Sequence, residues 1–223
     1  MAIRRLLIAT TNPAKLAEYR LILRDIGIEL ELVSLAEVGI SETPEETGAT
    51  FTENALLKAR FYFKRARMAT LADDGGLEID ALGGEPGVRS HRWLGTGGDD
   101  SDQALVAEVI RRMKGVEAAR RTARLRATIA LTDEEGGWRA RRPAPLGIRE
   151  RTAEAAIEGV IAERAYPVIR AGFPYRAVLV IPERNRYLGE LGDEEEAQIS
   201  QRRIAILKLR DELERIAAGR AAG

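Results

Sequence analysis

The fold begins with a ten-residue stretch, Leu6-Leu7-Ile8-Ala9-Thr10-Thr11-Asn12-Pro13-Ala14-Lys15. Its first four residues form a short apolar run, which is typical of a buried strand. Asn12 is a good helix N-cap, and Pro13 is a good first helical residue. Apolar residues then recur at helical spacing until Gly27, a residue type that commonly ends helices. The stretch therefore predicts a strand, a tight turn and a helix.

Further strands and helices alternate along the rest of the chain. Residues 28–35 alternate in polarity and predict a half-buried strand with the inward residues Ile28, Leu30 and Leu32. Similar patterns predict strands at 68–72, 124–131 and 177–181 and helices at 52–66, 101–113 and 200–217. The Gly136-Gly137 pair predicts a hairpin whose second strand begins at Trp138. Strands that alternate with helices indicate an α/β domain, and the hairpin makes its sheet mixed.

Composition limits the possible classes of protein. The chain has 223 residues, of which 45% are hydrophobic and 31% charged, and its formal net charge is zero. This indicates one domain spanning residues 1–223 and argues against a disordered chain or a nucleic-acid partner. No apolar run suits a membrane span or a signal peptide, so we expect a cytoplasmic protein without a membrane partner. The absence of cysteine excludes thiolate chemistry, and a single histidine disfavours a multi-histidine zinc site or a Ser-His-Asp triad.

The turn between Thr10 and Lys15 has the features of an anion site. Free backbone N–H groups at a helix start, together with the helix dipole, attract phosphate. Lys15 adds a positive charge in the first helical turn. The stretch is neither a Walker sequence nor a dinucleotide-binding glycine loop. The alternative interpretation is a well-capped helix with a solvated lysine.

Two acidic pairs suit metal-assisted chemistry. Glu45 and Glu46 lie in an acidic loop, and Asp73 and Asp74 directly follow a predicted strand. Magnesium is usually held by one or two carboxylates together with substrate phosphates. A carboxylate packed near other acids has a raised pKa and can serve as a general base. The alternative is that these acidic segments are solvated.

Three stretches, in order along the chain, resemble motifs of the inosine triphosphate pyrophosphatase family: 9–15, 45–60 and 72–92. The resemblance implies a mixed α/β fold with an elongated, twisted central sheet flanked by helices. It also implies a hydrolase that uses magnesium, is usually a homodimer and acts in nucleotide metabolism. Its reaction converts non-standard purine nucleoside triphosphates to the monophosphate and pyrophosphate. Residues 152–164 are rich in Ala and Glu and favour a helix by propensity, but the resemblance makes 158–161 a strand, which we prefer.

The same resemblance assigns roles to individual residues. Glu45 and Asp74 would hold magnesium, and Asp74 would also be the base that activates water for attack at the α-phosphorus. The residues assigned to the nucleoside triphosphate substrate are Thr10, Thr11, Asn12, Lys15, Gly75, Phe173, Tyr175, Arg176, Glu196, Gln201 and Arg202.

Four of these positions depart from the family pattern. Gly75 stands where the family usually has a serine, which removes one hydroxyl contact. Arg176 replaces an acid, Glu196 a lysine and Gln201 a histidine, at positions that the family uses to recognise the base. We therefore expect weak preference for inosine or xanthosine triphosphate, with an amino-bearing base favoured because Glu196 could accept from an exocyclic amine. The alternative function is a nucleotide-binding protein of the same fold with lost or weak catalysis.

Overall fold

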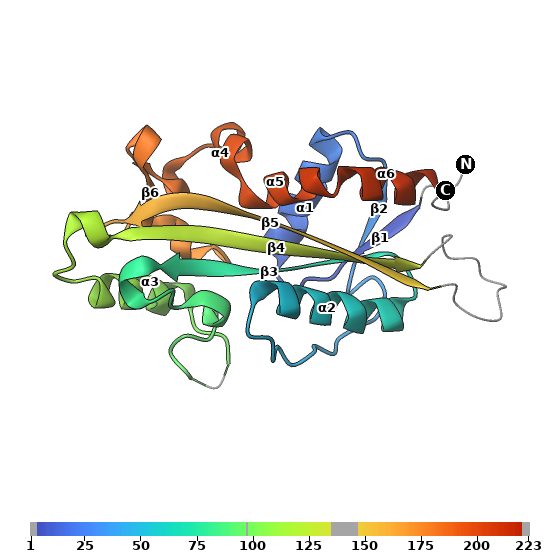
Figure 1. The fold of residues 1–223 in the computed structure, drawn as a ribbon, viewed down its shortest axis with the longest axis horizontal. Helices are drawn as coiled ribbons and strands as arrows, with labels where there is room; N and C mark the ends of the chain where they lie inside the picture. The colour runs from blue at the N-terminus through green and yellow to red at the C-terminus, as the bar shows by residue number, and fades with distance from the viewer. Residues whose placement is uncertain (1–3, 97, 135–146, 220–223) are drawn as a thin grey trace. The chain divides into compact units, whose positions relative to one another are not determined.

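The computed structural model describes residues 4–96, 98–134 and 147–219 of the chain. Within these ranges, strands form one seven-stranded sheet in the order β2-β1-β3-β4-β5-β6-β7 (Figure 1). The strands are β1 (Arg5–Ile8), β2 (Glu31–Ser34), β3 (Thr70–Ile79), β4 (Thr122–Glu134), β5 (Ile148–Ile161), β6 (Leu179–Ile181) and β7 (Arg186–Tyr187). The α-helices are α1 (Pro13–Asp25), α2 (Phe51–Ala66), α3 (Asp102–Arg112), α4 (Asp193–Ile199), α5 (Gln201–Lys208) and α6 (Arg210–Ala218). No helix in the described ranges is long and apolar enough to cross a membrane.

The sheet is mixed. Strand β1 is parallel to β2 and to β3, whereas β6 is antiparallel to β5 and to β7. The expected α/β class, with a mixed sheet and accompanying helices, is therefore confirmed.

The chain divides into two compact units. The first consists of the described residues of Met1–Asp74, Thr128–Glu154 and Arg202–Gly223. The second consists of the described residues of Gly75–Ala127 and Ala155–Gln201. Strands β3, β4 and β5 each contribute residues to both units.

Helix α2 packs on the strands of the first unit through small residues. Thr50 caps the helix, and Glu53 completes a capping box with the Thr50 backbone. Ala55 and Ala59 lie one turn apart and are fully buried, which lets the helix approach the sheet closely. They belong to a core cluster with Leu7, Ala9, Leu35, Tyr62, Ala72 and Ala130. Helices α5 and α6 lie on the other side of these strands (Figure 1).

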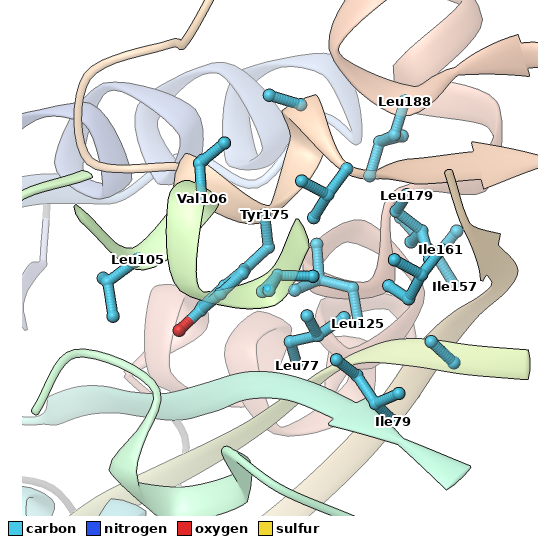
Figure 2. Close-up of a cluster of buried hydrophobic side chains, with 14 of the residues drawn as sticks. Leu77, Ile79, Leu105, Val106, Leu125, Ile157, Ile161, Tyr175, Leu179 and Leu188 are labelled. Atoms are coloured by element: carbon cyan, nitrogen blue, oxygen red, sulfur yellow. The ribbon is translucent and has the colours of Figure 1, made fainter. Parts of the chain in front are cut away.

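The second unit has its own hydrophobic core. Ser101 caps α3, whose Leu105 and Val109 point into this core and are fully buried. Strands β3, β4 and β5 supply further apolar side chains, and Figure 2 shows them converging with Tyr175 and Leu188. The core includes Tyr175, Ala177 and Val178 and so holds in place the segment before β6, which carries Phe173 and Arg176.

Strand β3 is longer than predicted, and this changes the setting of the acidic pair. The strand does not end at residue 72 but runs through Asp73 and Asp74 to Ile79. Gly75 permits this, because a Cβ at that position would lie 2.3 Å from the carbonyl oxygen of Arg126 in β4. The prediction that the two aspartates directly follow a strand end is therefore wrong.

Of the inward residues predicted in 28–35, Ile28 is buried but precedes the strand, and the inward face predicted within the strand is wrong. Strand β2 covers only Glu31–Ser34, and its buried residue is Val33, whereas Leu32 is half-buried. Val33 pairs with the fully buried Leu7 of β1, and this register selects the alternate face of the strand.

The remaining predictions have mixed outcomes. The helices at 13–26 and 101–113 and the strand at 124–131 are confirmed, and β5 confirms the strand interpretation of residues 158–161. The predicted helix at 200–217 is interrupted at the buried Leu209, and α4, which precedes it, was not predicted. Residues 174–177 form a 3₁₀ turn, so β6 begins only at Leu179. The predicted hairpin at Gly136-Gly137 and Trp138 lies outside the described residues.

Candidate active site

The turn after β1 is held by its own side chains. Asn12 Oδ1 accepts hydrogen bonds from the backbone N–H groups of Ala14, at 2.9 Å, and Lys15, at 3.3 Å. Thr10 Oγ1 accepts from the Asn12 backbone N–H at 3.1 Å. The predicted cap is confirmed, and it already satisfies two of the N–H groups at the start of α1.

A cavity of about 590 Å³ opens beside this turn. It lies next to the carboxyl ends of the parallel strands β1 and β2, a common place for ligands in α/β sheets. Its lining residues are Thr10, Thr11, Asn12, Pro13, Leu16, Ser34, Leu35, Ala36, Gly39, Ile40 and Ser41. Three predicted substrate residues, Thr10, Thr11 and Asn12, thus share one hollow, and its volume is in the range of small-molecule sites.

Lys15 points into the protein and not into that cavity. Its Nζ atom lies 3.1 Å from Asp73 Oδ2, and Arg202 Nε lies 3.2 Å from the same oxygen. Arg202 also pairs with Glu18 of α1 at 3.2 Å. Burial lowers the pKa of Lys15, and it opposes ionisation of Asp73, but Lys15 and Arg202 outweigh it and hold the pKa of Asp73 well below its ordinary value. The structure therefore brings Lys15 and Arg202 together through Asp73.

Asp74 belongs to a second charged group. Its Oδ1 atom lies 2.8 Å from Lys58 Nζ, and the same Nζ lies 3.1 Å from Glu46 Oε1. Burial raises the pKa of Asp74; Lys58 opposes this shift, and the negative charge of Glu46 adds to it. Asp74 Oδ2 is buried and has no hydrogen-bond partner among the described residues. This oxygen is available to a water molecule or a cation.

The loop that carries Glu46 is tied to α2. The buried Asn54 side chain accepts a hydrogen bond from the Gly48 backbone N–H at 2.8 Å. Lys58 lies one turn further along the same helix and holds Glu46 directly. Glu45, by contrast, is exposed, and the structure brings Glu46 and not Glu45 to Asp74.

Lys58 was not singled out from the sequence, although the pattern held a signal. It lies three residues after the buried Ala55 and four before the buried Tyr62, and therefore on the apolar face of an amphipathic helix. A lysine on such a face needs a buried anionic partner.

The donor set fits magnesium. Glu46 and Asp74 are two carboxylates, which is what magnesium usually takes from a protein when phosphate oxygens complete its shell. The described residues hold no group of three or more acidic or histidine side chains that could hold a metal without such help. The free Asp74 Oδ2 is the oxygen best placed to bind the ion.

Two of the expected base-binding residues, Arg176 and Glu196, lie in the second unit and neutralise each other. Arg176 Nη1 is 2.6 Å from Glu196 Oε1, and both side chains are buried. Arg170 Nη1 takes the other Glu196 oxygen at 2.9 Å. The Arg176 guanidinium also lies 4.0 Å from the centre of the Phe173 ring. Both Glu196 oxygens are thus engaged by arginines, which removes the support for an exocyclic amine as their partner.

Backbone contacts fix the segment around Phe173. Asp102 at the start of α3 accepts a hydrogen bond from the Gly172 backbone N–H at 2.7 Å. The buried Tyr175 hydroxyl donates to the Ser90 carbonyl oxygen, and burial raises the Tyr175 pKa above its ordinary value. The Tyr175 side chain lies among the apolar side chains of the core (Figure 2). Tyr175 is therefore a packing residue, and Gln201, at the start of α5, is also buried.

Comparisons with known proteins agree over nearly the whole chain. The model of the Ham1 family matches residues 6–212. A dITP/XTP pyrophosphatase of Bacillus subtilis is 39% identical over 208 residues, which cover 93% of this chain and 96% of the relative. A HAM1 protein from Coxiella burnetii has a TM-score of 0.74 at 32% identity, with 95% of this chain and 98% of the other covered. A nucleoside-triphosphatase (dITP/XTP pyrophosphatase) from Mycobacterium abscessus has a TM-score of 0.68 at 34% identity, covering 92% of this chain and 97% of that chain.

Proposed function

The chain belongs to the Ham1 family, and from this membership we propose that it is a nucleoside triphosphate pyrophosphatase. It hydrolyses non-standard purine nucleoside triphosphates to the monophosphate and pyrophosphate. The observation that carries the proposal is the buried Asp74, which has one free oxygen and lies in a group with Glu46 and Lys58. Such a group suits a reaction in which a carboxylate must take a proton beside a highly charged substrate.

Glu46 and Asp74 would hold magnesium, in place of the pair Glu45 and Asp74 expected from the sequence. We make this change because Glu46, and not Glu45, lies with Asp74. When bound, the ion would neutralise the charge that develops on the departing pyrophosphate.

The protein groups account for the other steps. Asp74 orients a water molecule and takes its proton as the water oxygen attacks the α-phosphorus. The bond between the α-phosphorus and the bridging oxygen then breaks, and pyrophosphate leaves. The raised pKa of Asp74 brings it closer to the value that suits a base near neutral pH. Lys15 and Arg202 keep the neighbouring Asp73 ionised. Thr10, Thr11 and Asn12 line the cavity that we assign to the phosphates of the substrate.

No observation favours the alternative of lost catalysis. That idea rested on charge replacements in the second half of the chain, yet Arg176 and Glu196 compensate each other in a buried ion pair. A homodimer, a cytoplasmic location and the absence of nucleic-acid and membrane partners remain part of the proposal.

Pyrophosphate release tests this function directly. We expect release from dITP and XTP that requires magnesium, measured with GTP and ATP in the same series. Asp74→Asn should lower turnover about a hundred- to ten-thousandfold, because the base is lost. Asp211→Asn, at an exposed position on α6, is the matched control and should keep wild-type activity. Wild-type turnover by folded Asp74→Asn protein would remove Asp74 from the catalytic role, and no release from any triphosphate would refute the function.

A further inference from the structure

Lys58 has an unusual position for a lysine. It projects from the apolar face of α2, and only 13% of its side chain is exposed. Its neighbours on that face are the buried Ala55, Ala59 and Tyr62. Burying a charge in such surroundings is costly unless ionic partners compensate. The position is therefore explained by what the ammonium group binds.

The ammonium group bridges the two carboxylates that we assign to magnesium. It lies 2.8 Å from Asp74 Oδ1 and 3.1 Å from Glu46 Oε1; the Asp74 side chain is buried, and the Glu46 side chain is 22% exposed. Without this bridge, two carboxylates on different segments would repel each other in a poorly hydrated setting. The Lys58 ammonium group thus lies between Glu46 and Asp74 and supplies there the positive charge that a bound metal ion would supply.

The same Lys58 ammonium group disfavours the binding of a metal ion when no nucleotide is present. A divalent cation bound to Asp74 Oδ2 and Glu46 would lie close to the Lys58 ammonium, and the two positive charges would repel. A triphosphate changes this balance, because its negative oxygens can pair with the ammonium and complete the shell of the metal. The affinities for metal and triphosphate are then coupled, and linkage makes the coupling reciprocal.

We propose that Lys58 is a positioning residue that keeps the Glu46–Asp74 pair closed to free magnesium and makes metal binding depend on the triphosphate. This inference rests on the proposed function for its choice of metal and nucleotide. Its central claim, that a neutral side chain at position 58 strengthens binding of magnesium alone, concerns the protein without substrate.

Calorimetric titration with magnesium chloride, without nucleotide, tests that claim. Lys58→Met keeps the length of the aliphatic chain and removes the charge, and we expect it to bind magnesium at least about tenfold more tightly than wild type. Lys64→Met, on the exposed surface of the same helix, is the matched control and should bind as wild type does. Lys58→Gln provides a second neutral variant if Lys58→Met does not fold, as judged by circular dichroism.

A second titration, with a nucleoside triphosphate that carries a non-hydrolysable α,β-imido bridge, measures the coupling. Wild type should gain more magnesium affinity from this analogue than Lys58→Met does. Magnesium binding by the folded neutral variant that equals or falls below that of wild type without nucleotide would overturn the inference. Because this readout needs no turnover, it is independent of the pyrophosphate assay, whose failure would refute the proposed function by itself.

Discussion

Asp73 and Asp74 are adjacent in sequence but have different partners. Successive side chains of a strand point to opposite faces, so Asp73 meets Lys15 of α1 and Asp74 meets Lys58 of α2. Asp73 Oδ2 is held by two cations, Lys15 and Arg202, whereas Asp74 Oδ2 has no hydrogen-bond partner among the described residues. One residue therefore stabilises the folded protein, and its neighbour is available for chemistry.

Replacing Asp73 should destabilise the protein in a pH-dependent way. Asp73→Asn leaves Lys15 and Arg202 without their shared carboxylate, and we expect a loss of about 3–5 kcal/mol in the free energy of unfolding near pH 7. The folded-state pKa of Asp73 lies below its ordinary value, so its stabilisation is present above that ordinary value and is lost as the pH falls below about 4. Urea denaturation should therefore show the difference between wild type and variant shrinking towards pH 3. A difference that stays constant, or one that Asp211→Asn reproduces, would contradict this.

The Arg176–Glu196 pair allows a test of base selection by charge exchange. Arg176→Asp alone places two carboxylates together, and Glu196→Lys alone places lysine beside two arginines, so each should reduce stability. The double variant Arg176→Asp/Glu196→Lys restores an ion pair, with the acid at position 176 and the lysine at position 196, as the family pattern has them. We expect it to recover stability and to raise the ratio of kcat/KM for inosine triphosphate over ATP and GTP. If wild type already prefers inosine triphosphate by about a thousandfold, these residues do not govern selection.

The contact between β3 and β4 depends on Gly75. Gly75→Ser would place a Cβ 2.3 Å from the Arg126 carbonyl oxygen, so the backbone of one strand would have to move. We expect a cost of about 1–3 kcal/mol in unfolding free energy, measured by urea denaturation. Gly98→Ser is the control, because a Cβ there meets no atom within 4 Å. Equal stability of both variants would show that β3 and β4 can separate at little cost.

The sequence predicted those helices and strands that are determined by residues close together in the chain. The strand, Asn12 cap and helix at the start followed from side-chain chemistry, as did the Ser101 cap of α3. The continuation of β3 could not be predicted, because Gly75 resembles a turn residue unless its neighbour on β4 is known. The sequence also could not show that Glu46 and not Glu45 lies beside Asp74. That choice depends on contacts of the loop with Lys58 and Asn54, which lie in the helix that follows.

The continuous strands β3, β4 and β5 predict that the protein unfolds cooperatively. Three strands contribute residues to both compact units, so the backbone of each of these strands is continuous from one unit into the other. We expect the loss of strand structure in one unit to destabilise the same strands in the other. In a Trp138→Phe background, the fluorescence of Trp93 reports on the second unit, and circular dichroism reports on the whole chain. We expect both signals to give one midpoint, and Asp73→Asn in the first unit to lower both equally. A Trp93 midpoint unaffected by that change would instead mean two independently folding domains.

The composition of β5 has a consequence for how the chain acquires its structure. Residues 152–164 are rich in Ala and Glu, which favour helix, yet most of them form a strand next to β4 and β6. A nascent chain reaches this segment before residues 179–181 have been synthesised, so only part of its eventual pairing is then possible. We therefore expect local turns of helix in this segment to melt before the strand docks, and we expect the segment to need protection by chaperones during synthesis.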